Sequence, residues 1–464
     1  MATKVDVLLE LRAPAADAFA MHEAAVESER EAFRQSEQLV ADLAGFGIEV
    51  SNEYAPVPMF TTQEGTFSVD LEAFAIPEQN ADVPSQSIVI AAEVDRAAIP
   101  DLQGRGVIVW PNSPLVLFSS CSCAAEGVAT DDEHLFDLAP SAGGIDCRPF
   151  RPAVSRATIR ALLGVDRVWR DGFRGQNVVV GIIDEGVNDT VYPVIGGFSR
   201  PNSPRPGSAP ITSHGSMCAA DVLVAAPAAK LYDYPFLGHP NSGGALTMFQ
   251  AVLDHRRIDG TPHLTNNSYG FVGRPPKNEM PNHEVWDPNH PVHRKVREVV
   301  ASGAPAFFAA GNCGEDCPSS KCHVSGIGPG NSIHASNSLQ EVITVAAVNS
   351  RHQRIGYSSQ GPGGFFNQKP DIAAYSHFFG NFGPGRPAGG DATSFDNGTS
   401  AATPVAVGVG ALLMSAFPDL TPPRMKAAMI QSAINIGQPG FDHETGFGVM
   451  NAAVAYNLIR NGAV

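Results

Sequence analysis

The chain has 464 residues and a net charge of −16, with 43% hydrophobic and 17% charged residues. This length favours two or three domains, and the composition is that of an ordinary globular protein. The acidic balance, with no basic patch, argues against a nucleic-acid partner. No stretch reaches the roughly 18 apolar residues of a membrane span, so we expect no membrane partner.

The N-terminus lacks the apolar core of a signal peptide, so we expect a cytoplasmic protein. Secretion by another route stays open. The seven cysteines are an odd number in a long chain, which does not resemble a disulfide framework.

Residues 1–118 are predicted to form a small α+β domain. Residues 5–11 alternate like a strand, and residues 15–43 carry apolar residues at helical spacing. Further strands are expected at residues 87–94 and 107–110, with a short helix between them. The order strand, long helix, strand, strand, short helix, strand suggests a ferredoxin-like sandwich.

Residues 119–155 are predicted to be a linker, because they show no amphipathic period. From residue 156 onwards, continuous apolar runs alternate with helical patterns. Such runs are typical of strands buried on both faces of a parallel sheet. We therefore predict that residues 156–464 form a doubly wound α/β domain with a mainly parallel sheet.

Four polar residues stand at positions suited to acyl transfer. Ser400 and His214 each begin an apolar helix rich in small residues, and Ser400 follows a Gly-Thr turn. Asp184 and Asn312 come just after buried strands, and sites in open α/β sheets gather at such strand ends. Each residue alone is more simply explained as a cap, a turn residue or a buried structural side chain. Together they suit a nucleophile, a base, an orienting acid and an oxyanion donor.

The segments around these residues read Gly-Ile-Ile-Asp-Glu-Gly, Ser-His-Gly-Ser, Ala-Ala-Gly-Asn and Asn-Gly-Thr-Ser, in chain order. In this order they resemble the motifs of the subtilisin-like serine proteases, the subtilases, over residues 156–464. The resemblance implies a serine endopeptidase in which Ser400 attacks a peptide carbonyl, His214 moves its proton and Asp184 holds the imidazole. It also implies that the Asn312 side chain and the Ser400 backbone N–H stabilise the oxyanion.

Other segments are similar to the family's substrate-binding elements. Ser268, Tyr269 and Gly270 resemble its substrate-binding strand, and Ala310 and Gly311 precede the oxyanion residue. The resemblance implies a peptide or protein substrate, no cofactor and no metal ligands in the catalytic site. The calcium loop of the subtilisins is missing before the apolar run 229–234, which argues against that calcium site.

Glu185 stands where the bacterial subtilisins carry a small hydroxyl residue. Either it faces the substrate and favours a basic residue near the cut, as in the kexin-like branch, or it is an exposed loop acid. Cys218 follows His214 by one helical turn, and we expect a buried small residue there and not a second nucleophile.

Two insertions depart from the family pattern: residues 273–293 and the loop that follows Asn312. Three cysteines and a histidine in the second loop could bind zinc: Cys313, Cys317, Cys322 and His323. Their spacing is unusual for zinc, so a disulfide or free thiols are favoured. We expect this loop to shape the substrate pocket.

Residues 1–118 look like a subtilase propeptide, which implies a domain that docks on the peptidase domain. We hypothesise that residues 114–120 lie in the active-site cleft as an extended strand and are cut by the enzyme itself. Two alternatives to a general endopeptidase remain. One is a dedicated intracellular maturation protease for one peptide or partner protein, and the other is an inactive, subtilase-shaped binding protein.

Overall fold

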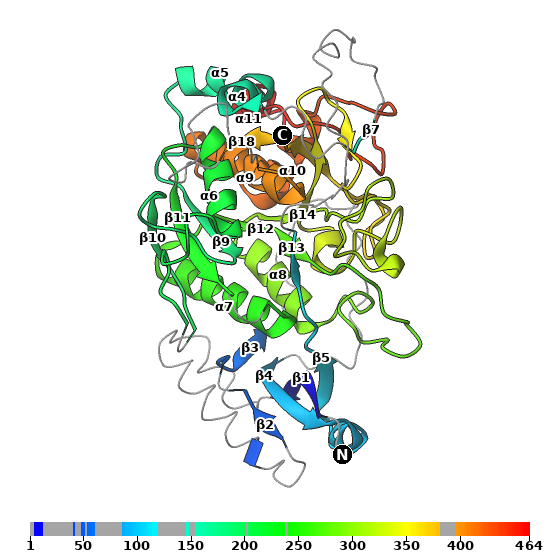
Figure 1. The fold of residues 1–464 in the computed structure, drawn as a ribbon. Helices are drawn as coiled ribbons and strands as arrows, with labels where there is room; N and C mark the ends of the chain where they lie inside the picture. Colours follow the sequence, from blue (N-terminus) through cyan, green and yellow to red (C-terminus); the bar gives the residue numbers. More distant parts are fainter. Residues whose placement is uncertain are drawn as a thin grey trace.

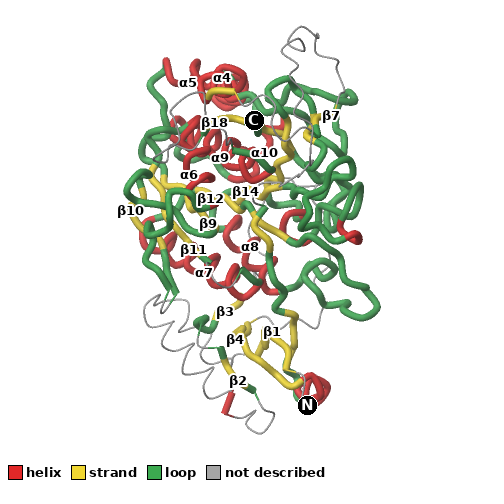
Figure 2. The backbone as a smooth tube through the Cα atoms, in the orientation of Figure 1, coloured by secondary structure: helices red, strands yellow, loops and turns green. Residues whose placement is uncertain are grey.

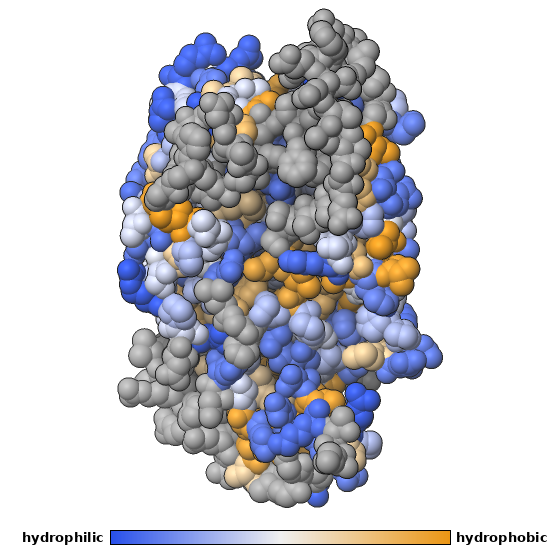
Figure 3. Space-filling model, viewed as in Figure 1, coloured by the Kyte–Doolittle hydropathy of each residue, from blue (hydrophilic) through white to orange (hydrophobic). Residues whose placement is uncertain are grey.

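The computed structural model describes residues 4–12, 40–41, 48–51, 53–60, 86–118, 145–147, 154–200, 203–236, 240–380 and 396–464. An N-terminal sheet lies at one end of the molecule, next to a larger α/β body (Figure 1). In Figure 2 the strands of this sheet lie at the bottom of the view, below the helices of the body. Apart from the grey atoms, hydrophilic residues cover much of the face in Figure 3, and apolar residues gather near its centre.

A mainly parallel sheet forms the centre of the body. Its strands are β7 (Ile145–Asp146), β9 (Val179–Asp184), β10 (Val194–Gly197), β11 (Lys230–Pro235), β12 (Leu264–Asn267), β14 (Ala306–Ala309), β15 (Ile343–Val348), β16 (Arg354–Ile355) and β17 (Ile372–Tyr375). Their order is β10-β11-β9-β12-β14-β15-β16-β7, and β17 also pairs with β15. Among the described strands of this sheet, only β15 and β16 form an antiparallel pair. The doubly wound α/β prediction is confirmed, although β7 comes from the segment expected to be a linker.

Helices cover both faces of this sheet (Figure 1). They are α4 (Arg156–Leu163), α5 (Val165–Arg170), α6 (His214–Ala225), α7 (Ser242–Asp259), α8 (Pro291–Ala301), α9 (Thr399–Ala416), α10 (Pro422–Gln431) and α11 (Ala452–Arg460), with short 3₁₀ turns η3 (Val324–Gly326) and η4 (Ala335–Ser338). The core on one face includes α6 and α9, and the core on the other face includes α7 and α8. Helices α4 and α5 are separate, because Gly164 between them adopts a left-handed φ of 72°.

Helix α9 passes through the core of the body. With 18 residues and a mean hydropathy of 1.4, it is long and apolar enough to cross a membrane, but 89% of it is buried inside the protein. The expectation that no stretch is apolar enough for a span is therefore wrong for this helix, which is a core helix here. Helix α9 packs on α6 so closely that a Cβ on Gly408 would collide with the Val222 carbonyl.

The N-terminal sheet is antiparallel. Its strands are β1 (Lys4–Arg12), β2 (Glu49–Val50), β3 (Val57–Phe60), β4 (Gln86–Asp95) and β5 (Ile108–Pro111), and η1 (Arg96–Ala98) and α3 (Ile99–Gly104) connect the last two. These elements agree with the expected α+β class. The long helix expected at residues 15–43 lies outside the described residues, except for residues 40–41, which are helical.

The two faces of the N-terminal sheet have different partners, because successive side chains of a strand point to opposite faces. Val7 and Leu9 of β1 pack with Leu102 of α3 in the core of the N-terminal domain. Leu8 points to the other face, where it packs with Leu246 of α7. The N-terminal domain therefore rests with one apolar face on the helices of the body.

Two more strand pairs complete the described fold. One joins β6 (Val116–Leu117) to β13 (Tyr269–Gly270) in antiparallel fashion, and the other joins β8 (Val154–Ser155) to β18 (Phe378–Phe379). The first pair connects the end of the N-terminal domain to the carboxyl side of the central sheet, which is the side on which sites form in open α/β folds.

Candidate active site

A carboxylate and an imidazole lie in contact at the carboxyl edge of the sheet. Asp184 is the last residue of β9 and is fully buried, and His214 is the first residue of α6. Asp184 Oδ1 lies 2.7 Å from His214 Nδ1 and also accepts a 2.7 Å hydrogen bond from the backbone N–H of Glu185. The other ring nitrogen, Nε2, has no hydrogen-bond partner within the described chain. The ring is thus oriented to accept a proton at Nε2.

Ser400 lies in the first turn of α9, two residues after the capping Gly398. Gly398 has a φ of 82°, and a Cβ there would come 2.9 Å from Phe118 O, so only glycine fits. Ser400 Oγ donates to Phe118 O at 2.9 Å and lies 3.3 Å from Ser268 O. The hydroxyl is therefore directed at a carbonyl of the chain itself.

The side-chain amide of Asn312 is held in one orientation. Its Oδ1 accepts hydrogen bonds from the Thr399 N–H at 3.0 Å and the Thr399 hydroxyl at 2.9 Å. Its Nδ2 donates to Phe118 O at 3.0 Å. Among the described residues, the Ser400 backbone N–H makes no hydrogen bond to Phe118 O, although we expected it as the second donor. Oxyanion donors are aimed at the oxygen of the tetrahedral state, which differs in position from the ground-state carbonyl.

Residues 114–118 lie along the site as an extended strand. Strand β6 pairs with β13, and the Phe118 N–H donates to Ser268 O at 3.2 Å. The three residues expected to bind substrate, Ser268, Tyr269 and Gly270, thus all lie beside this strand. An extended peptide that adds to a strand edge is a common mode of peptide recognition.

Sequence analysis missed the segment on the other side of this strand. The Leu115 N–H donates to Pro240 O at 2.5 Å, and the Ser242 N–H donates to Ser113 O at 3.1 Å. The only sequence signal was Asn241, whose side chain caps the N-terminus of α7. An N-cap predicts where a helix begins but not which distant segment lies beside it.

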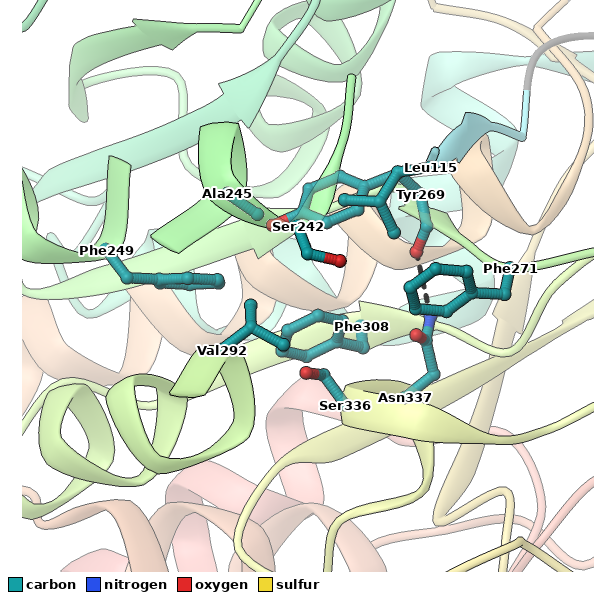
Figure 4. Close-up of a pocket in the computed structure, with 10 residues that line it drawn as sticks. All are labelled: Leu115, Ser242, Ala245, Phe249, Tyr269, Phe271, Val292, Phe308, Ser336 and Asn337. Carbon is teal, nitrogen blue, oxygen red and sulfur yellow. Dashed lines mark hydrogen bonds between the residues drawn. The ribbon is translucent and has the colours of Figure 1, made fainter. Parts of the chain in front are cut away.

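Two side chains of the strand are inserted into the body. Phe118 is 5% exposed, and its ring lies against two glycines. A Cβ atom added to Gly270 would lie 2.7 Å from the end of the ring, and one added to Gly311 would lie 3.5 Å from it. Leu115 is one of the residues that line an apolar pocket (Figure 4). The other lining residues are Ser242, Ala245, Phe249, Tyr269, Phe271, Val292, Phe308, Ser336 and Asn337.

The remaining candidates support the site from behind. The Ala310 N–H donates to Val345 O inside the central sheet, and the Gly311 N–H donates to Thr399 Oγ1 at 3.2 Å. The Asn337 side-chain amide donates to Tyr269 O at 2.9 Å (Figure 4). These contacts fix the strand that binds residues 114–118.

A profile of the subtilase family (peptidase S8) matches residues 175–448, which is more than half of the chain. The chain belongs to the subtilase family. Subtilisin DY of Bacillus licheniformis is 29% identical over 307 residues, which cover 63% of this chain and 96% of that protein. The serine protease AprX of Bacillus subtilis is 25% identical over 323 residues, which cover 61% of this chain and 69% of AprX.

The subtilase also resembles a solved structure along nearly its whole length. Fervidolysin from Fervidobacterium pennivorans, a keratinolytic enzyme related to subtilisin, matches with a TM-score of 0.57 at 16% identity. The match covers 98% of this chain and 61% of fervidolysin, so the chain spans less than two thirds of that protein. This likeness supports the fold, and the family establishes a subtilisin-like serine endopeptidase.

Glu185 of the subtilase is not the exposed loop acid of one expectation, whereas its expected role in binding a basic substrate residue stays a prediction. It is partly buried, and its Oε2 accepts a 2.8 Å hydrogen bond from the backbone N–H of His214, at the positive end of α6. Burial lowers the pKa of His214, whereas the charge and hydrogen bond of Asp184 and the charge of Glu185 raise it, and the net direction is upward.

Replacing Glu185 with glutamine is expected to shift the pH profile of the enzyme. The imidazole accepts a proton only when it is neutral, so activity is lost as the pH falls through the pKa of His214. Removing the negative charge of Glu185 lowers that pKa, and the acid limb of kcat/KM should move down by roughly half a pH unit. Peptide hydrolysis between about pH 5 and 9 measures this shift.

The control for this experiment is Glu279→Gln, since Glu279 is exposed in the first insertion. Its acid limb should coincide with that of the wild type. If Glu185→Gln also leaves the limb in place, Glu185 does not influence the base. Peptides with basic and apolar residues at the second position before the cut test the other expected role of Glu185.

Cys218 is a buried thiol beside Asp184 and Ser400. Its Sγ lies 3.7 Å from Asp184 Oδ2 and 3.6 Å from Ser400 O, and burial raises its pKa well above the usual value. A thiol in this state is a poor nucleophile. Asp184, His214 and Cys218 form the one cluster with metal-ligand spacing in the described part of the chain, but the first two are already paired with each other.

The cysteines of the loop after Asn312 form disulfides and not a zinc site. Cys313 is bonded to Cys322, and Cys317 is bonded to Cys147. The zinc alternative is therefore wrong, and the disulfide alternative is correct. The second bridge attaches the segment expected to be a linker to the loop that follows Asn312.

Proposed function

We propose that this subtilase cuts its own chain after Phe118 and that its N-terminal domain then blocks the active site as a bound product. The observation that carries the proposal is the position of Phe118 O, which accepts hydrogen bonds from Ser400 Oγ and Asn312 Nδ2. The candidate nucleophile and the candidate oxyanion donor thus meet at one peptide carbonyl, as acyl transfer requires.

The proposed reaction uses the three catalytic residues in sequence. Ser400 Oγ adds to the carbonyl carbon of Phe118 while His214, oriented by Asp184, takes its proton. The tetrahedral intermediate collapses, the C–N bond after Phe118 breaks, and His214 gives the proton to the leaving amine. Water, activated by the same imidazole, then releases Phe118 as a carboxylate and restores the serine.

Contacts outside the strand favour a domain that stays bound after the cut. Arg294 of α8 forms a 2.6 Å ion pair with the buried Glu10 of β1. Lys295, also fully buried, donates to Pro58 O at 2.6 Å, and Asn112 accepts a 2.8 Å hydrogen bond from the first turn of α7. A product attached to such a surface remains at a high local concentration beside the site.

The pockets around the strand give the proposed substrate preference. Phe118 is buried beside Gly270 and Gly311, and Leu115 lines an apolar pocket, as the first and fourth residues before the proposed cut. Substrates should therefore carry an aromatic residue at the first position and leucine at the fourth, since polar groups there would lose hydration without a partner.

Time courses of self-cleavage test the proposal. The wild-type chain should release an N-terminal fragment whose intact mass corresponds to residues 1–118. Phe118→Asp should slow this cleavage by at least about a hundredfold, because a carboxylate would have to take the place of a buried ring. Phe118→Leu is the matched control, and it should be cleaved at a rate close to that of the wild type.

A fragment that ends at another residue would contradict the proposal, as would equal cleavage rates for Phe118→Asp and Phe118→Leu. A chain that stays intact but hydrolyses added peptides would show that the N-terminal domain is not a self-cleaved inhibitor.

We also propose that the enzyme works in an oxidising compartment. The support is the pair of disulfides Cys313–Cys322 and Cys147–Cys317, because such bridges persist mainly outside the cytosol. This proposal replaces the cytoplasmic expectation drawn from the N-terminal residues.

A further inference from the structure

Glu284 is a buried carboxylate that the catalytic mechanism does not use. It lies in the first insertion, between β13 and α8, and has no exposed surface. Its carboxylate contacts Ser113, which is the sixth residue counted back from Phe118 as the first. The contact therefore lies at the far end of the extended strand from Ser400.

All four hydrogen-bonding functions of Ser113 are met by the body. Its N–H donates to Glu284 Oε1 at 3.0 Å, and its Oγ donates to Glu284 Oε2 at 2.8 Å. Its carbonyl accepts from the Ser242 N–H at 3.1 Å. The fourth contact joins Ser113 Oγ to His283 Nε2 at 3.1 Å.

The direction of this fourth bond follows from the proton positions. His283 Nδ1 accepts a 3.1 Å hydrogen bond from the Val285 N–H, so Nε2 carries the ring proton. His283 Nε2 therefore donates to Ser113 Oγ, whose own proton goes to Glu284. The site requires a side chain that donates and accepts at one atom, as a hydroxyl does.

The carboxylate is held in place independently of the N-terminal domain. Ser242 Oγ donates to Glu284 Oε1, and the buried His293 donates from Nε2 to Glu284 O at 2.7 Å. His290 Nε2 also lies 3.6 Å from Oε1, although it hydrogen-bonds Pro111 O of the N-terminal domain at 3.0 Å. Burial raises the pKa of Glu284, but the nearby His290 and His283 lower it by a larger amount. The pKa therefore lies below its usual value, and the carboxyl group is ionised. Such a site is preorganised to bind a donor.

We propose that Glu284 and His283 form a subsite that selects a hydroxyl side chain, serine above all, six residues before the cleaved bond. The inference rests on the proposed function, because Phe118 defines where the count begins. Ser113 is the occupant supplied by the chain itself, and a substrate strand that replaces residues 113–118 would present its own sixth residue to the same groups.

Peptide hydrolysis by the self-processed enzyme, separated from its 1–118 fragment, tests this subsite. The substrate is Asn-Ser-Pro-Leu-Val-Leu-Phe-Ser-Ser, a copy of residues 112–120, and its partner has alanine in place of the first serine. The serine peptide should have a kcat/KM at least about tenfold higher, since hydrogen bonds to a charged group are lost with alanine. In Glu284→Gln this ratio should fall below about three.

Glu279→Gln is the matched control, since it removes an exposed carboxylate from the same insertion. It should keep the full serine-to-alanine ratio. A ratio near one in the wild type, or an undiminished ratio in Glu284→Gln, would overturn the proposal. Hydrolysis of either peptide by the wild type, at whatever ratio, would still support the proposed peptidase activity.

A second measurement does not depend on catalysis. In the full chain carrying Ser400→Ala, the additional change Ser113→Ala or Glu284→Gln should speed amide hydrogen exchange in residues 113–118 by about tenfold. Glu279→Gln should leave that exchange unchanged. Unaltered protection in both Ser113→Ala and Glu284→Gln would show that the subsite contributes nothing to binding the strand, even if the enzyme cuts no peptide.

Discussion

Replacing Ser400 with alanine should leave the full-length chain uncut and abolish peptide hydrolysis. The expected loss in kcat is about a millionfold, which is the size of the loss when a subtilisin loses its nucleophile. The physical reason is that Ser400 Oγ is the one hydroxyl in the described structure that lies within hydrogen-bond distance of Phe118 O. Intact mass of the purified chain and release of a fluorescent leaving group measure the two effects.

Ser415→Ala, near the other end of the same helix, is the control for this change. It also removes a hydroxyl from α9, but we expect it to be processed like the wild type. Release of the 1–118 fragment by Ser400→Ala would show that another group, or another protease, makes the cut.

Replacing Asn312 with alanine should lower kcat by roughly a hundredfold to a thousandfold, with a small change in KM. A loss of this size is known for subtilisin without its oxyanion asparagine. We expect a similar loss here because this chain belongs to the same family. Here Asn312 Nδ2 donates to Phe118 O, and that bond should strengthen as the oxygen becomes negative. Steady-state kinetics on a peptide with phenylalanine before the cut provide the measurement.

Asn312→Ala also leaves the N–H and hydroxyl of Thr399 without their acceptor, which costs about 1–3 kcal/mol per unsatisfied buried group. Asn312→Asp separates the two effects, because it keeps the acceptor and removes the donor. It should lose kcat as fully as alanine but less thermal stability. A kcat within about threefold of the wild type in both variants would remove Asn312 from the oxyanion site.

The sequence allowed the catalytic end of the site to be predicted for a physical reason. Asp184 and Asn312 each end a continuous apolar run, and such runs mark parallel strands whose carboxyl ends meet at one edge. His214 and Ser400 begin helices of small residues, which allow close packing behind them. Local patterns of this kind were sufficient to assign the α/β class and to place these four residues at one edge.

The features beyond this edge depend on contacts between distant segments. Cys317 is bonded to Cys147 across 170 residues, and nothing in their spacing selects that pair. Glu284 lies in an insertion without periodicity, and its role depends on Ser113, which meets it only when the N-terminal sheet rests on α7 and α8. Glu185 was recognised as unusual, but its hydrogen bond to the first turn of α6 follows from tertiary geometry.

The proposed nucleophile Ser400 and the proposed base His214 lie on the first turns of two helices that are packed along each other, α9 and α6. The distance between these helices is limited at Gly408, about two turns beyond Ser400, where the chain has no room for a side chain. Gly408 therefore acts as a spacer that sets how near the two reactive groups can come, although it takes no part in the chemistry. Alignment of the reacting atoms is in this sense a property of the buried core, so the surface loops that choose a substrate can diverge without disturbing it.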